Sequence, residues 1–194
     1  YHPHLTDNLL PVLSPMAAMT RVVRKKYGEN IPVVFIGPCV AKKIETEEVS
    51  EAITLTELRD MFNDLGLRPE NVTPSEFDPP LGGRGAIFPV NRGLLQAARL
   101  NDDAVNGVII AAEGRTDFQE AIKEFEEGLI KGQNLELLCC EGCIMGPGMS
   151  KGGKQYNRRA LVKTYAQQKM EIIDIEEWQN NLEEFSQIDL SVNY

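Results

Sequence analysis

The amino-acid sequence predicts an α/β fold of two lobes, each with parallel sheet segments flanked by helices. Apolar, strand-like runs alternate with helix-like stretches along most of the 194 residues. Two of these runs end just before loops that carry cysteines. The composition, with 42% hydrophobic and 25% charged residues, is sufficient for a substantial core. Because binding and active sites of α/β proteins lie at the carboxyl ends of the parallel strands, we expect the two cysteine loops to converge in a cleft between the lobes.

The first lobe is expected over residues 14–80 and opens with a helix. The pair Ser14-Pro15 is typical of a helix N-cap followed by the first helical position, and apolar residues then recur at helical spacing. A short β-branched run predicts a strand over residues 32–36, directly before the loop that carries Cys39.

A second helix of this lobe is predicted from a capping box. Thr54 and Glu57 have the required spacing, and apolar residues follow at helical intervals until Gly66. Residues 69–85 are rich in proline, glycine and charge without periodicity, so they are predicted to form a loop or crossover.

The second lobe is expected over residues 81–170, followed by a terminal helix at 171–185. Thr116 and Gln119 resemble a second capping box, which would open a helix that closes near Gly132. Apolar runs and helical periodicity predict the other elements: strands at 86–88, 107–112 and 135–138, and helices at 94–100 and 157–168.

All four cysteines lie in the two loops, Cys39 in G-P-C-V-A-K-K-I-E and the others, Cys139, Cys140 and Cys143, in C-C-E-G-C-I-M-G-P-G. Thiolates are soft ligands that suit iron–sulfur clusters, zinc or copper(I), and adjacent glycines allow the backbone to approach bridging sulfurs. Zinc stays open as an alternative, because Cys139 or Cys140 with Cys143 has a plausible ligand spacing. Simple burial of the thiols is a further alternative.

Charge and hydropathy argue against several function classes. The net charge of −9 would repel nucleic acid, and no apolar run approaches the ~20 residues of a membrane span. The start of the sequence lacks the features of a signal peptide, so a cytoplasmic protein is expected. His2 and His4 form an H-x-H pattern that can bind metal, but we assign it no role because it lies near a chain end. The basic residues after the last cysteine, Arg158 among them, are expected to be solvated.

On these residues the chain resembles the C-terminal part of the catalytic domain of iron-only (FeFe) hydrogenases, over nearly its whole length. Two of that family's cysteine signatures are represented: M-P-C-x-x-K-x-x-E, and C-x-x-x-C followed by a glycine-rich turn. Further matches lie in the L-S-x-x-K-S-P region and in the G-A-A-x-I-F-G segment. The matching residues are Leu9, Ser14, Pro15, Pro38, Cys39, Lys42, Glu45, residues 85–88, Cys139, Cys143, Gly146 and Gly148.

The resemblance implies a cubane 4Fe-4S cluster joined to a two-iron subcluster, which together form the H-cluster. It implies Cys39, Cys139 and Cys143 as metal ligands, with Cys140 as the alternative to Cys139. Two of these residues would also be catalytic: Cys143 would bridge to the two-iron unit, and Lys42 would donate a hydrogen bond to one of its cyanides. The residues at the positions that line the cofactor pocket are Pro15, Met16, Gly37, Phe88 and Pro89.

The resemblance also implies a larger parent protein. The family's first signature, T-S-C-C-P, would align upstream of Tyr1, so we expect a fragment of a longer chain. That signature carries the fourth cluster ligand and a proton-shuttling cysteine. This fragment alone is therefore expected to be inactive and metal-free or partly loaded. Its expected partners are the missing N-terminal part of the same chain and either a ferredoxin-like electron carrier or a downstream signalling domain.

Several departures from the family pattern cluster around the chemistry. Gly37 stands where methionine is usual, Met16 where glutamine is usual, and Pro89 where glycine is usual. Leu10 aligns with a serine of the proton path and has no group that can relay a proton. The parent is therefore expected either to oxidise and produce H2 reversibly or, as we favour, to sense it. The alternative is a non-catalytic hydrogenase-like protein that binds a cluster for sensing or assembly.

Overall fold

Two parallel two-stranded sheets are present in residues 2–45, 47–100 and 108–194, which are the residues that this computed structural model describes. In the first sheet, β1 (Val34–Ile36) pairs with β2 (Glu51–Ile53). In the second, β3 (Ile109–Glu113) pairs with β4 (Asn134–Leu138). The predicted α/β class with parallel sheet segments is confirmed.

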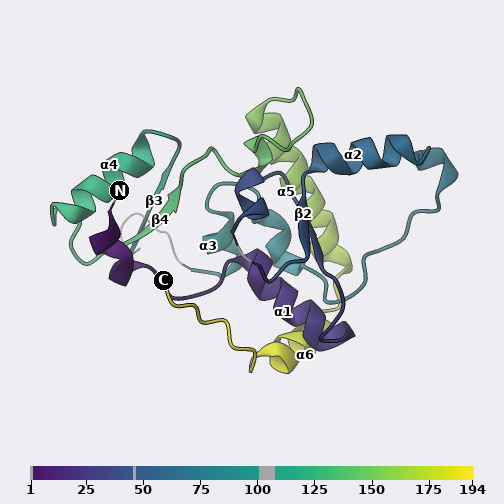
Figure 1. Ribbon diagram of the computed structural model, residues 1–194, viewed down its shortest axis with the longest axis horizontal. Coiled ribbons are helices and arrows are strands. Elements are labelled where there is room, and N and C mark those ends of the chain that lie inside the picture. The colour runs from purple at the N-terminus through teal and green to yellow at the C-terminus, as the bar shows by residue number, and fades with distance from the viewer. Residues whose placement is uncertain (1, 46, 101–107) are drawn as a thin grey trace.

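Helices flank both sheets (Figure 1). Figure 1 places α4, beside β3 and β4, toward one end of the longest axis and α2 toward the other. The α-helices are α1 (Pro15–Tyr27), α2 (Leu55–Asp64), α3 (Gly93–Ala97), α4 (Asp117–Glu126), α5 (Gln155–Ile172) and α6 (Ile175–Phe185). Short 3-10 helices are η1 (Pro3–Asn8), η2 (Val40–Lys43), η3 (Pro69–Asn71), η4 (Gly83–Ile87) and η5 (Cys143–Met145).

The predicted starts of the first two α-helices are confirmed by their caps. Ser14 Oγ accepts a hydrogen bond from Ala17 N at 3.4 Å, and Pro15 is the first residue of α1. At α2 the capping box is reciprocal: Glu57 N donates to Thr54 Oγ1 at 3.1 Å, and Thr54 N donates to Glu57 Oε2 at 2.7 Å. These starts could be predicted because each cap and its partner lie three residues apart.

The second predicted capping box is wrong. Thr116 precedes α4 with helical backbone angles, φ −99° and ψ −54°, and its side chain makes no cap hydrogen bond. An N-cap side chain reaches the first turn from an extended backbone, which Thr116 does not have. Gln119 instead donates from Nε2 to Arg115 O at 2.8 Å. The helix also ends at Glu126, earlier than the expected Gly132.

Two short elements differ from the sequence prediction. The expected strand at 86–88 is occupied by η4 and the residue after it, because a three-residue apolar run does not distinguish a strand from a helical turn. Gly83 begins η4 with φ +49°, a backbone conformation that favours glycine. Strand β2 was not predicted, since it is defined by its pairing with β1 and has no distinctive local pattern.

Other boundaries shift by a few residues. The helix expected at 94–100 is the shorter α3, and the strand expected at 107–112 is β3, with residue 107 outside the described residues. The two terminal helices are confirmed, but α5 runs on to Ile172. The break before α6 is set by Asp174, whose side chain accepts from Glu177 N at 3.0 Å.

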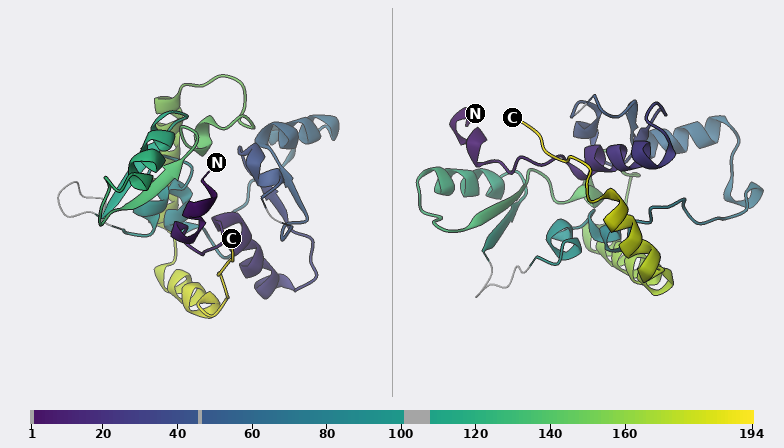
Figure 2. Two further views of the ribbon diagram at one scale, coloured as in Figure 1. Left: turned by 60° about the vertical axis from the view of Figure 1, so that its left-hand side comes forward. Right: turned by 90° about the horizontal axis from the view of Figure 1, so that it is seen from below.

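The two sheets belong to units that stand apart in space. The left view of Figure 2 shows β3, β4 and α4 on one side and α1, β1, β2 and α2 on the other. Helix α5 packs against η4 and η5, while the C-terminal tail returns to the N-terminal segment, where Leu13 N donates to Leu190 O at 2.8 Å. The proposed division into lobes at residues 14–80 and 81–170 stays a prediction.

The buried core consists mainly of small residues. The accessible surface of the protein is 13924 Å², whereas a compact monomer of 21.6 kDa would expose about 9,200 Å². Much apolar surface is therefore left uncovered, including Ile44, which is 90% exposed. The buried apolar residues are Met16, Ala17, Ala52, Leu95, Ala121, Ile144 and Ala166.

Candidate metal centre

The loop that carries Cys39 lies directly against the turn that follows Cys143. Gly148 N donates to Pro38 O at 2.9 Å. A Cβ added to Gly146 would lie 2.6 Å from the same carbonyl oxygen, and one added to Gly148 would lie 2.6 Å from Thr54 Cγ2. Both distances are well inside van der Waals contact, so only glycine allows the two loops to pack this closely. The two cysteine-bearing loops of the sequence therefore meet.

A third segment packs on the same turn. Ile144 N donates to Pro89 O at 3.2 Å. Gly142, directly before Cys143, has φ +89°, and a Cβ there would lie 2.5 Å from Asn91 Oδ1. Residues 89–91 thus contact the turn from the side of η4, and the role of Pro89 in lining a cofactor pocket stays a prediction.

Cys143 lies in the electrostatic field of two other thiols and one ammonium group. Burial is the largest effect and raises the pKa of the Cys143 thiol, Cys140 and Cys39 raise that pKa further, and Lys42 acts in the opposite direction. Each of these influences requires the side chain of Cys140, Cys39 or Lys42 to lie within electrostatic range of Cys143. Cys139, which we took as a ligand from the sequence, is not among the groups that act on Cys143 in the described structure. Cys139 and Cys140 are both exposed.

Lys42 is held by a short chain of polar side chains. Its ammonium group pairs with Glu45 Oε2, and Ser14 Oγ donates to Glu45 Oε1. This chain links η2 to the N-terminus of α1, where Pro15 lies. An ammonium group has three donors, so the pair with Glu45 leaves donors on Lys42 for an anionic ligand.

The predicted pocket-lining residues differ in how deeply they are buried. Met16 is 5% exposed and belongs to the core, whereas Phe88 is 39% exposed. Pro15 is exposed at the start of α1. Gly37 is buried at the end of β1, where an added Cβ would lie 2.6 Å from the Phe35 ring.

The sequence analysis missed the role of Arg158. Its guanidinium donates to Ile144 O at 2.6 Å, to Ser150 O at 2.7 Å and to the Gly152 carbonyl. The five donors of an arginine fork can serve several carbonyls at once, and a glycine-rich turn offers such carbonyls. Arg158, at the start of α5, therefore holds the segment after Cys143 in place instead of standing free in solvent.

The four thiols supply soft donors and are not gathered around one point. Thiolates around a single zinc lie about 3.8 Å apart, given Zn–S bonds of about 2.3 Å in a tetrahedron. Within the described residues, no three cysteine sulfurs lie within 4.8 Å of one another. In a cubane each thiolate binds a different iron, so its ligands stand farther apart. The soft thiol donors are of the kind that suits an iron–sulfur cluster.

One family of known proteins matches most of this chain. Two parallel-sheet units flanked by helices define the class of the chain as an α/β protein. The family described as iron only hydrogenase large subunit, C-terminal domain, matches residues 1–147, and the chain belongs to this family. The resemblance inferred from the sequence is confirmed.

Solved structures support the fold. Two variants of the [FeFe]-hydrogenase HydA1 from Chlamydomonas reinhardtii, each with one glutamate replaced, match with a TM-score of 0.56 and 17% identity. The matches cover 92% and 91% of this chain, and 63% of each of those chains. The chain therefore spans less than two thirds of the length of these proteins.

Within the described residues, no helix is long and apolar enough to cross a membrane.

Proposed function

We propose that this chain forms the H-cluster-type iron–sulfur site of a hydrogenase-like protein that acts on H2, either as a reversible catalyst or as a sensor. The observation that carries the proposal is the contact between the Cys39 loop and the Cys143 turn. That contact depends on Gly146 and Gly148, which stand where a side chain would separate the loops. Close packing of this kind supports a shared inorganic ligand.

The ligands from this chain are Cys39, Cys143 and one residue of the adjacent pair. The effect of Cys140 on the pKa of Cys143 favours Cys140 over Cys139 as that third ligand. Separate Cys139→Ser and Cys140→Ser variants test this choice after anaerobic loading with iron and sulfide. We expect Cys140→Ser to lose iron and Cys139→Ser to retain it. The reverse pattern would restore Cys139 as the ligand.

An H-cluster, when bound, supplies reversible cleavage of H2 and a route for the electrons. The chain's own residues hold and surround it. Burial keeps the Cys143 thiol protonated until a metal displaces the proton. Lys42, fixed by Glu45, offers donors and a positive charge to anionic ligands such as cyanide.

Two residues favour sensing over rapid turnover. Leu10 is 76% exposed and has neither a donor nor an acceptor, so the proton path that the resemblance implies lacks a relay there. Met16 is almost fully buried and cannot donate a hydrogen bond to a two-iron unit. Met16 also supports the second candidate, a non-catalytic protein that holds an ordinary cubane for sensing or cluster assembly.

The uncovered apolar surface supports further polypeptide at this site. The exposed area exceeds that of a compact monomer, and exposed apolar residues include Leu9, Leu10 and Ile44, which flank the polar chain to Lys42. We propose that the polypeptide preceding Tyr1 in the family covers this surface and provides the fourth ligand. An electron carrier or a signalling domain would then be the partner of the whole protein.

The decisive experiment uses the full-length parent, loaded with iron, sulfide and the two-iron precursor. Infrared bands of bound carbonyl and cyanide are expected if the two-iron unit is held. A verified cubane without those bands would replace the H-cluster with the second candidate. A Lys42→Arg variant probes the role of the ammonium group. Its guanidinium has a different shape and should not reproduce the hydrogen bond to a cyanide, so the cyanide bands should shift more than the carbonyl bands.

A further inference from the structure

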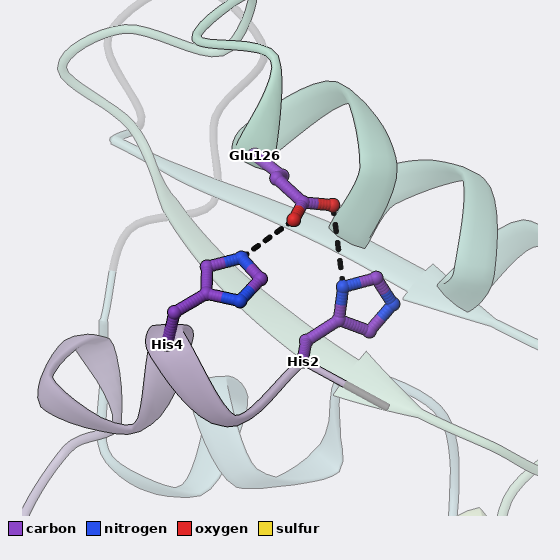
Figure 3. A group of neighbouring side chains, drawn as sticks. All are labelled: His2, His4 and Glu126. Carbon is purple, nitrogen blue, oxygen red and sulfur yellow. Dashed lines mark ion pairs between the residues drawn. The ribbon is translucent and has the colours of Figure 1, made fainter.

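The two histidines of this chain form a compact group with a glutamate (Figure 3). His2 Nδ1 lies 3.2 Å from Glu126 Oε2, and His4 Nε2 lies 2.5 Å from Glu126 Oε1. One ligand atom of each residue lies within 4.8 Å of the others. No other three histidine, cysteine, aspartate or glutamate residues of the described structure are grouped so closely.

The backbone presents both imidazoles to the same carboxylate. His2 precedes η1 and His4 lies within it, while Pro3 between them has its φ fixed by the proline ring. Thr6 Oγ1 donates to Pro3 O at 2.7 Å, which closes the turn. The ring centroids are 6.0 Å apart at an interplanar angle of 65°, so the rings are not stacked. Figure 3 shows that one nitrogen of each ring faces the Glu126 carboxylate. Glu126 is the last residue of α4.

The chemistry of the three groups suits a divalent cation. Two neutral imidazoles and one carboxylate carry a charge of −1, in a protein whose net charge is −9. Ligand atoms about 2.0–2.1 Å from a tetrahedral zinc lie about 3.3 Å from one another. The distance from His2 Nδ1 to Glu126 Oε2 is close to this, at 3.2 Å, whereas the 2.5 Å from His4 Nε2 to Glu126 Oε1 has to lengthen when an ion enters. Two histidines and one carboxylate also form a ligand set that zinc uses, with one position left for water.

We propose that His2, His4 and Glu126 form a surface site for Zn²⁺ or a similar divalent metal ion. The bound ion ties η1, at the start of the described chain, to the end of α4. The site shares no residue with the cysteine centre, and it does not depend on whether that centre holds an H-cluster or an ordinary cubane.

The test is a Zn²⁺ titration of the 194-residue chain, without a histidine tag, followed by NMR of histidine side chains. His2 and His4 are the only histidines of the sequence, so zinc held by thiolates leaves these signals unmoved. Both imidazoles are expected to shift together and to saturate. The Glu126→Gln variant should weaken binding at least about tenfold, as expected for a lost ligand. Fluorescence of Trp178, the single tryptophan, checks that the variant is folded.

The matched control is Glu127→Gln, one residue further on, whose carboxylate lies 4.0 Å from Lys123 Nζ. It should bind zinc within about twofold of the unaltered chain. Histidine signals that stay unmoved, shift independently or respond equally in both variants would overturn the proposal and leave a pair of ordinary histidine–glutamate contacts.

Discussion

Replacing Gly146 by alanine tests directly how the two cysteine loops are held together. The added Cβ would lie 2.6 Å from Pro38 O, against about 3.4 Å for the short end of ordinary contact, so the loops must separate by about 0.8 Å. Overpacking of this kind costs about 1–3 kcal/mol. The same carbonyl accepts the 2.9 Å hydrogen bond from Gly148 N, and weakening that bond adds about 1 kcal/mol.

We therefore expect Gly146→Ala to lower the free energy of unfolding by about 2–4 kcal/mol, measured by urea denaturation. The variant should also retain less iron after anaerobic loading, because Cys39 and Cys143 move apart. Gly82→Ala is the matched control: its φ is −66° and an added Cβ meets nothing within 4 Å. It should change stability by less than about 0.5 kcal/mol. Equal stability and equal iron content in the two variants would refute the reasoning.

Three further predictions follow from other contacts. Arg158→Ala should lower the free energy of unfolding, measured by urea denaturation, by about 1–3 kcal/mol, because the backbone carbonyls that accept from Arg158 lose their donor. The neighbouring Arg159 is exposed, and Arg159→Ala should leave this free energy unchanged. The hydrogen bond from Lys43 is the main cause that lowers the pKa of Glu57 to about 2. The free energy of unfolding should therefore fall as the pH drops from about 4.5 to 2, and in Glu57→Gln this fall should be smaller. Cluster loading, assayed as bound iron, should improve as pH rises, because the raised pKa of Cys143 opposes loss of its proton.

Each of these three predictions has a contrary outcome. Equal unfolding energies for the two arginine variants would mean that the turn is stable without the guanidinium. For Glu57, the sign follows from its lowered pKa in the folded state: its carboxylate stabilises the fold above the unfolded pKa, and this contribution is lost on acidification. An unchanged acid profile in the glutamine variant would contradict that assignment. Iron loading that is independent of pH would show that Cys143 is already a thiolate in the metal-free protein.

The sequence analysis was most accurate where the signal is local. The caps at Ser14 and Thr54 involve partners three residues away, and both are confirmed. Strand β2 and η4 were misjudged because each is too short to have a distinctive period, and their form depends on segments distant in the chain. The Thr116 cap failed because the residue pattern of a capping box does not fix the backbone angles of its first residue.

The sequence by itself determined the α/β class, the family and the soft thiol donors, because these follow from apolar periodicity and from the cysteine motifs. Only the tertiary structure decided which of these residues meet. It brought the Cys39 loop against the turn after Cys143, gave Arg158 its carbonyl partners and joined Glu126 to His2 and His4. The physical reason is range: a cap or a helical period is set within a few residues, whereas such contacts depend on how whole elements pack.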